Sequence, residues 1–216
     1  MSVPRWVLAL LISSLGVQLA WRSFQHPAAE TTAQLPPPPG VQALRLASFG
    51  EPEAASRLAM VHLQSYRNPD YPRLIGWLDS ILELDPESSY PLFAAARVYA
   101  ETADAANSRL ALEFVYRRFF DDPNRRWPWL AHAALLAKHR LKDLALARRY
   151  AQTLQRHATA PAVPAWAKQM EIFILEDLNE LEAAKILIAS LLRGGLLTDP
   201  AEIRYLTEKL EELQQR

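Results

Sequence analysis

Two histidines lie close together in the segment AHAALLAKHR and are the first candidates for chemistry. His132 and His139 are seven positions apart, so on a helix they face the same side, with Trp129 one turn earlier. A helical zinc pair is typically spaced four positions apart with a nearby carboxylate, as in H-E-x-x-H. The spacing here differs, and the sequence contains no cysteine. We therefore expect no metal site and no cofactor.

Other catalytic patterns are also missing from the sequence. We find neither a G-x-S-x-G nucleophile motif nor a glycine loop of the kind that binds phosphate. Carboxylates are numerous, but the densest group, within residues 171–182, is interpreted as the solvated face of a helix. We expect a protein that is not an enzyme and has no small-molecule substrate.

The segment NRRWPW, residues 124–129, alternates basic and aromatic side chains. Such patterns occur in surfaces that bind nucleic acids or anionic lipids. The formal net charge of the chain is zero, which argues against a nucleic-acid partner. We interpret the tryptophans as side chains that wedge one helix pair against the next.

Charge is unevenly distributed along the chain. The formal balance is −3 for residues 1–108, +7 for residues 109–156 and −4 for residues 157–216. A basic middle between acidic ends is compatible with an acidic partner, or with neighbouring structural repeats whose surfaces are complementary.

The elements that would position these residues are helices. Glycine is scarce, and past residue 45 the apolar residues recur at helical spacing between capping and breaking signals. The first helix is expected to begin at Ser48–Glu51, the second to run from Asp70 to Asp85, the third over residues 89–102 and the fourth over residues 106–121. The fifth is expected from Trp127 to Lys138 and the sixth over residues 142–157. The seventh is expected to begin at Pro161 and Pro164, the eighth to run from Asn179 to Gly194, and a polar last helix to begin at Asp199.

The even-numbered helices are expected to end near residues 85, 122, 158 and 194, at intervals of 37, 36 and 36 residues. A regular interval of this size in paired helices predicts a solenoid, because each pair exposes an apolar face that only the next pair covers. The polar last helix would cap that array.

The second helices carry residues at positions i, i+4 and i+7 that match one repeat pattern. They are Leu74, Leu78 and Ile81 before Pro86, Ala111 and Val115 before Pro123, Ala147, Ala151 and Leu154, and Ala184, Ile188 and Leu191. This pattern resembles the tetratricopeptide repeat (TPR) family over about residues 48–215. The resemblance implies an all-α, right-handed α-solenoid of about four helix pairs plus a capping helix over residues 48–216, and binding of a protein or peptide.

In TPR-like arrays the first helix of each pair lines the concave groove. The resemblance therefore implies partner-binding positions at Phe93, Trp129, His132, His139, Trp166, Gln169 and Phe173, bordered by Arg97, Arg125 and Arg126. Large aromatic side chains of this kind suit a peptide or helix ligand. The alternative is plain core packing.

The N-terminal residues 1–22 contain WVLALLISSLGVQLAW, an uncharged stretch with a tryptophan at each end. This pattern predicts a transmembrane helix or signal anchor that enters the membrane through residues 4–21. A cleaved signal peptide is the alternative, although its best cleavage site places Gln18 at a position that favours small residues. The sparse flanking charges favour an inside N-terminus. The localisation expected is therefore single-pass, in the inner membrane if the source is bacterial, with the domain extracytoplasmic or periplasmic.

Residues 23–47 form the expected proline-rich linker, which includes Pro36–Pro39. Proline fixes φ and has no N–H group, so this tetraproline is expected to be a polyproline II spacer. With the helical array, the linker predicts a membrane-anchored scaffold or assembly factor for a protein or peptide partner at the membrane. The alternative is a structural accessory subunit of a multi-chain membrane complex.

Overall fold

The structure is a computed structural model that describes residues 7, 13–18, 34–194, 197 and 199–215. It divides the chain into two compact units, Met1–Gln34 and Leu35–Arg216. The predicted anchor lies mostly outside the described residues, and the described part of it, residues 7 and 13–18, is helical. Of the helices that the structure describes, none is long and apolar enough to cross a membrane.

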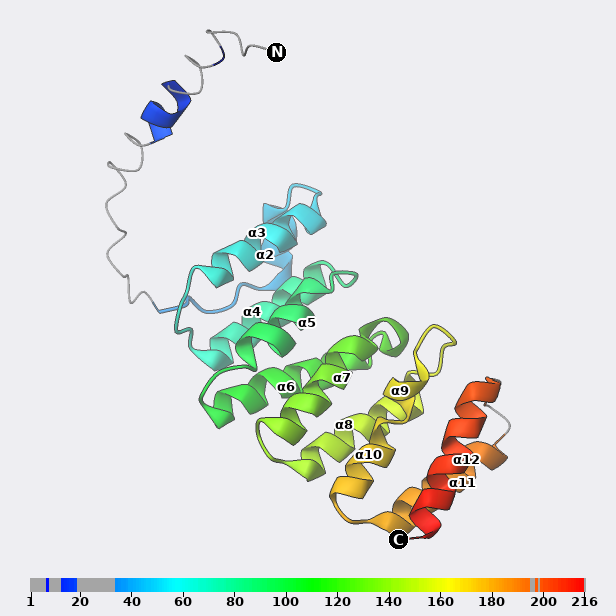
Figure 1. Cartoon of the computed structure of the whole chain (residues 1–216). Coiled ribbons are helices and arrows are strands. Elements are labelled where there is room, and N and C mark those ends of the chain that lie inside the picture. Colours follow the sequence, from blue (N-terminus) through cyan, green and yellow to red (C-terminus); the bar gives the residue numbers. More distant parts are fainter. Residues whose placement is uncertain (1–6, 8–12, 19–33, 195–196, 198, 216) are drawn as a thin grey trace. The chain divides into compact units, whose positions relative to one another are not determined.

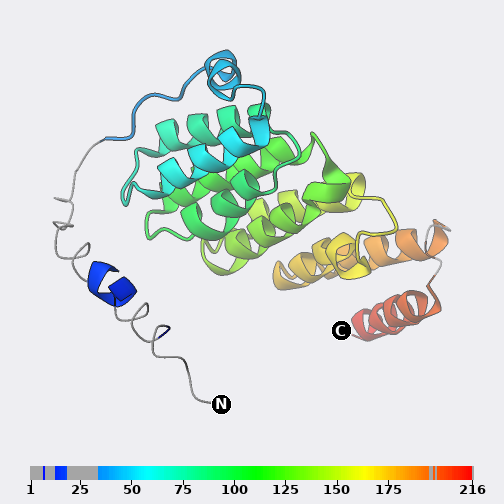
Figure 2. The ribbon, with the colours of Figure 1, turned by 90° about the horizontal axis from the view of Figure 1, so that it is seen from above.

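In the second unit every regular element that the structure describes is a helix, which confirms the all-α prediction. These elements lie beside one another in chain order in Figures 1 and 2. They are α2 (Val41–Ala47), α3 (Pro52–Gln64), α4 (Tyr71–Leu84), α5 (Tyr90–Ala94), the π-helix η1 (Ala95–Tyr99), α6 (Ala105–Phe119), α7 (Pro123–His139), α8 (Leu144–His157), α9 (Ala165–Lys168), α10 (Met170–Asp177), α11 (Leu181–Arg193) and α12 (Pro200–Gln214).

Aspartate begins many of the longer helices. The carboxylates that accept a backbone N–H bond from the first turn belong to Asp70, Asp104, Asp122, Asp143 and Asp199, at α4, α6, α7, α8 and α12. Each cap satisfies a backbone donor that the helix itself leaves unpaired, and is typically worth about 1 kcal/mol. The starts of these five helices are therefore set by short-range chemistry.

A repeat of about 36 residues is visible in where the second helices end. Helices α4, α6, α8 and α11 end at Leu84, Phe119, His157 and Arg193, which are 35, 38 and 36 residues apart. Contacts run from α4 to α6, then α6 to α7, α7 to α8, α8 to α10 and α10 to α11. The all-α unit is therefore repeat-like.

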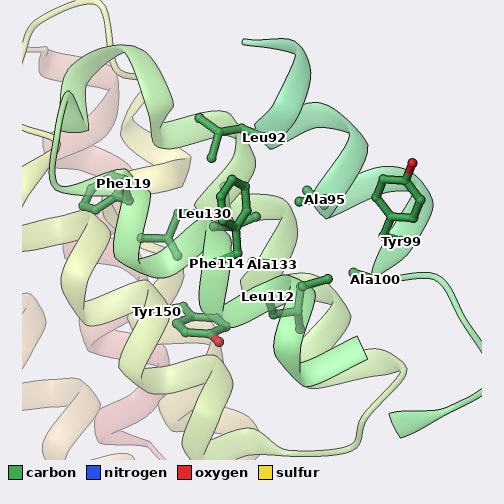
Figure 3. Close-up of a cluster of buried hydrophobic side chains, with 14 of the residues drawn as sticks. Leu92, Ala95, Tyr99, Ala100, Leu112, Phe114, Phe119, Leu130, Ala133 and Tyr150 are labelled. Carbon is green, nitrogen blue, oxygen red and sulfur yellow. The ribbon is translucent and has the colours of Figure 1, made fainter. Parts of the chain in front are cut away.

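The core follows the same order along the chain. Figure 3 shows the part in which Leu92, Phe114, Leu130 and Tyr150, from α5, α6, α7 and α8, pack together. A second, smaller cluster joins α10, α11 and α12. Helix α12 buries Leu206 and Leu213 of this cluster and exposes polar residues together with Ile203 and Tyr205.

Ion pairs join the basic segment, residues 109–156, to the acidic segments on either side of it. Arg118 of the basic segment pairs with Asp79, and Arg148 pairs with Glu180. In the same way Lys138 pairs with Asp177. The interpretation as complementary surfaces of neighbouring repeats is therefore confirmed for these residues.

Helix α7 begins four residues earlier than Trp127, the predicted start. Asp122-Pro123 was expected to stop the preceding helix, but it also starts the next one. The Asp122 carboxylate accepts the Arg125 N–H, and a proline at the first helical position lacks only an N–H that would be unpaired anyway. Pro128 consequently lies inside the helix rather than in its first turn.

Two of the expected helices are interrupted. Helix α5 passes into η1, where the N–H of Ala100 bonds to the carbonyl of Ala95, five residues earlier. The seventh helix starts at Ala165, directly after Pro164, one of the two prolines predicted to open it, and it breaks at Gln169, whose φ and ψ are −97° and 1°. Sequence periodicity shows a helix in both places, but it does not show a change in hydrogen-bond register.

Residues 35–47, expected to belong to the linker, are part of the second unit. Residues 41–47 form α2, and Leu35 is fully buried in the main core. We call residues 35–40 the proline strap. The indole N–H of Trp77 donates to the Pro36 carbonyl at 2.9 Å, so the strap lies along α4 and does not stand free as a spacer.

Candidate functional site

The predicted groove residues fall into separate places. Trp166 and Phe173 line a cavity between α7 and the α9–α10 segment. Phe93, Trp129, His132 and Arg97 lie on α5, η1 and α7, while Arg125, Arg126 and Gln169 hold structural contacts and His139 is exposed at the end of α7.

The cavity has a volume of about 340 Å³ and a mainly apolar lining. Its walls carry large apolar side chains that are unusually exposed: Leu135 at 41%, Phe173 at 38% and Trp166 at 51%. The full lining consists of Ala134, Leu135, Lys138, Trp166, Met170, Phe173 and Ile174. We call this feature the α7–α10 groove.

The groove is positioned by helix α8, against which α7, α9 and α10 all pack. The Trp127 and Trp166 rings meet edge to face at one end, with centroids 5.5 Å apart. At the other end Lys138 forms an ion pair with Asp177. Both pairs join residues 39 positions apart, so α7 and the α9–α10 segment run in the same direction along the groove.

Trp129 belongs to a different contact. Its ring meets Phe93 of α5 edge to face, with centroids 5.6 Å apart, and Phe93 in turn stacks on Tyr90. Trp129 is partly buried and packs against the main core. The Phe93–Trp129 contact joins α5 to α7.

His132 lies beside this contact, and two charged neighbours, Arg97 and Glu101, act on its pKa in opposite directions. Its Nε2 atom is 3.6 Å from the Glu101 carboxylate, too far for a hydrogen bond. Burial lowers the pKa of His132, and the charge of Arg97 lowers it further, whereas Glu101 acts in the opposite direction. The imidazole is therefore held neutral near pH 7.

Arg125 and Arg126 do not border the groove. The Arg126 side chain is 4% exposed and donates to the Pro86 carbonyl at 2.9 Å and to Asp121 at 2.6 Å. Arg125 donates to the same Pro86 carbonyl at 3.1 Å. Both arginines therefore fasten the turn between α4 and α5 to the start of α7.

Gln169 is also structural in its contacts. Its side chain is 5% exposed and donates to the Glu202 carboxylate of α12 at 2.6 Å. The bond lies at the break between α9 and α10, so it ties that break to the last helix.

Leu135 and Met170, which line the groove, and Trp127, which contacts Trp166 at one end of it, were not among the residues predicted from the sequence. Trp127, Ala134 and Lys138 lie at positions i, i+7 and i+11, on one helical stripe. Trp129 lies two positions further on and so faces another neighbour. The stripe is visible in the sequence, but which of two close tryptophans faces α9 depends on packing.

Comparisons with known proteins identify no family for the chain. No family model, curated protein or solved structure matches it.

Proposed function

We propose that this chain is a membrane-anchored, non-enzymatic interaction protein of TPR-like architecture that binds a protein partner in the α7–α10 groove. The observation that carries the proposal is the groove itself, an open apolar cavity walled by Leu135, Trp166 and Phe173. Exposed aromatic side chains around a hollow are typical of surfaces that bind proteins.

The architecture proposed is a right-handed solenoid of about four helix pairs with α12 as its cap. Two features support it: the second helices end at intervals of 35 to 38 residues, and α7 runs in the same direction as the α9–α10 segment. In such an array the first helices line one face. That face would present the groove.

The ligand chemistry follows from the lining. The cavity would take a large apolar side chain from a partner segment, either an amphipathic helix or an extended peptide. The Lys138–Asp177 pair at one end of the groove offers both a cation and an anion to a polar group next to that apolar side chain of the partner. Desolvation of the aromatic walls would supply most of the affinity.

The membrane attachment proposed uses residues 4–21, and the domain would face the extracytoplasmic side. The uncharged stretch between Trp6 and Trp21 supports this attachment. The partner would then be a protein at the same membrane, and the chain would act as a scaffold or assembly factor.

Site-specific photocrosslinking tests the groove. A photoreactive phenylalanine replaces Phe173 in the full chain, which carries a C-terminal tag and is extracted in mild detergent. The matched control places the same group at Ile186 of α11, which is 67% exposed and outside the groove. We expect a discrete crosslinked protein from position 173 only. Equal crosslinking from both positions, or none from position 173, would contradict the proposal.

A groove variant provides the second arm. Trp166→Ala removes a half-exposed wall, so we expect a folded protein that loses the crosslinked partner. Trp129→Ala removes a core contact, so it should lower the melting temperature instead. Co-purification of several chains in fixed stoichiometry that survives Trp166→Ala would favour the accessory-subunit alternative over groove binding.

A further inference from the structure

The proline strap, residues 35–40, lies against a stripe of side chains on α4. Arg73, Gly76, Trp77 and Ser80 occupy positions i, i+3, i+4 and i+7 of this helix, so they share one face. The strap has no helical or strand bonding, and Gly40 at its end has φ −64° and ψ 144°, within the polyproline II region.

Three donors of the stripe bind three carbonyl groups of the strap. Arg73 donates to the carbonyl of Leu35 at 2.8 Å. Trp77 donates to that of Pro36 at 2.9 Å, and Ser80 donates to that of Pro39 at 2.9 Å. A polyproline II segment makes no internal hydrogen bonds, so its carbonyls are available to a receptor.

Gly76 makes room for the strap between these donors. A Cβ atom at this position would lie 2.7 Å from Cγ of Pro38, closer than any normal contact. Glycine in the middle of a helix is unfavourable relative to alanine, so its presence at this point of α4 needs a local reason. The close approach of the Pro38 ring supplies that reason.

At one end of the strap, Leu35 is fully buried between the helices, whereas Pro36, Pro37 and Pro38 remain exposed. The strap is therefore held by one apolar anchor and by backbone carbonyls, and it is not enclosed by the core. Aromatic and hydrogen-bonding side chains arranged in this way are the means by which proteins recognise polyproline II ligands.

We propose that the Arg73–Gly76–Trp77–Ser80 stripe is a binding site for polyproline II segments led by a leucine, with residues 35–40 as its resident intramolecular ligand. The site is separate from the α7–α10 groove and does not depend on the function proposed for it. Because the resident ligand is attached to the domain, its effective concentration is high, and a segment in trans binds only when the strap is released.

The test uses the full chain in detergent with a fluorescein-labelled peptide of residues 33–40, AQLPPPPG. In the released-strap protein, Leu35→Asp removes the buried anchor and is combined with Pro36→Gly, Pro37→Ser, Pro38→Gly and Pro39→Ser. Fluorescence anisotropy should show at least tenfold tighter peptide binding to this protein than to the parent chain. A peptide with Leu35→Asp should bind at least tenfold more weakly than the parent peptide. Equal affinity for the parent and released-strap proteins would overturn the proposal.

Gly76→Ala provides the matched variant on the receptor side. Alanine is the better helix former, so α4 itself should not be weakened, while the added methyl group blocks the seat of Pro38. Added to the released-strap protein, Gly76→Ala should abolish peptide binding. Retained binding would overturn the proposed site.

A distance measurement covers the case in which the released-strap protein is unstable. The chain has no cysteine, so spin labels can be attached through Pro37→Cys and Glu87→Cys, two exposed positions. Pulsed electron paramagnetic resonance should give a narrow distance distribution in this labelled protein and a broad one after Gly76→Ala. An unchanged narrow distribution would show that the strap is not held by this stripe.

Discussion

Arg118 of α6 donates a hydrogen bond of 2.6 Å to the carboxylate of Asp79 in α4, across 39 positions of sequence. A second bond of 2.8 Å joins Arg118 to Glu83, one turn further along α4. The Arg118 and Asp79 side chains are 19% and 23% exposed, so water screens the pair only partly. Arg118 and Asp79 lie about one repeat apart in the sequence, so their contact joins the second helices of two neighbouring helix pairs.

Arg118→Ala should lower the free energy of unfolding by about 1–3 kcal/mol, because it leaves the partly buried Asp79 without its main partner. Urea unfolding followed by circular dichroism measures the change. Arg57→Ala is the control, since its i,i+4 pair with Glu53 is largely exposed and should contribute less than about 0.5 kcal/mol. Similar losses in the two variants would refute the inter-repeat role of Arg118.

Asp143→Ala should destabilise the protein by about 0.5–2 kcal/mol at pH 7, because Asp143 caps α8. The Leu146 N–H and then Arg109 hold the pKa of this carboxyl below its ordinary value. Its stabilisation is therefore complete above the unfolded pKa and is lost as the pH falls through the folded pKa. Unfolding at pH 7 and pH 3 should show a smaller difference between parent and variant at pH 3. An equal difference at both values would contradict a charge contribution.

His132 should make the protein less stable in mild acid. Its pKa is lowered in the folded state, so the unfolded chain takes up the proton first. The stabilisation is complete above the ordinary pKa of 6.5 and declines as the pH falls below it. The melting temperature should fall less between pH 7.5 and 5.5 in His132→Gln than in the parent. His139→Gln, at an exposed position, should keep the parent slope.

Glu171→Gln should leave the melting temperature at pH 7 unchanged or raise it. Glu171 is 3% exposed, and burial raises the pKa of its carboxyl in spite of Arg148 and Gln152. The ionised form is therefore disfavoured in the folded state, and this group stabilises the fold increasingly as the pH falls through its folded pKa.

The advantage of Glu171→Gln over the parent should accordingly shrink between pH 7 and pH 4 in thermal melts. Glu182→Gln is the control, because the Glu182 side chain is 83% exposed and should have almost no effect. A marked loss of stability in Glu171→Gln at pH 7 would mean that the pair with Arg148 outweighs burial.

Much of the helical layout was predictable because it depends on neighbours in sequence. An aspartate cap acts on the backbone N–H two or three residues later, as Asp70 does on Arg73, and apolar periodicity reflects the pitch of a single helix. The same local rules explain the error at α7. Asp122-Pro123 can end one helix and begin the next. In the structure it begins α7, which is why this helix is longer than predicted.

The candidate groove was predictable only in part. Trp166 and Phe173 line it, but Trp166 contacts Trp127, which was not among the predicted positions, whereas the predicted Trp129 contacts Phe93. Two tryptophans separated by two positions are related by a rotation of about 200° about the helix axis, so they point in nearly opposite directions. Which of them meets α9 depends on how α7 rotates against α8.

By itself the sequence determined most of the helices, the aspartate starts of α4 and α12, and a spacing of about 36 residues between helix ends, because helix starts and ends follow from interactions within a few positions. Only the tertiary structure decided where the side chains and carbonyls of distant segments meet. It docks Pro36 on Trp77 and pairs Arg118 with Asp79. Such contacts cross 39 to 41 positions, and no local propensity encodes them, because they exist only once neighbouring helices have packed.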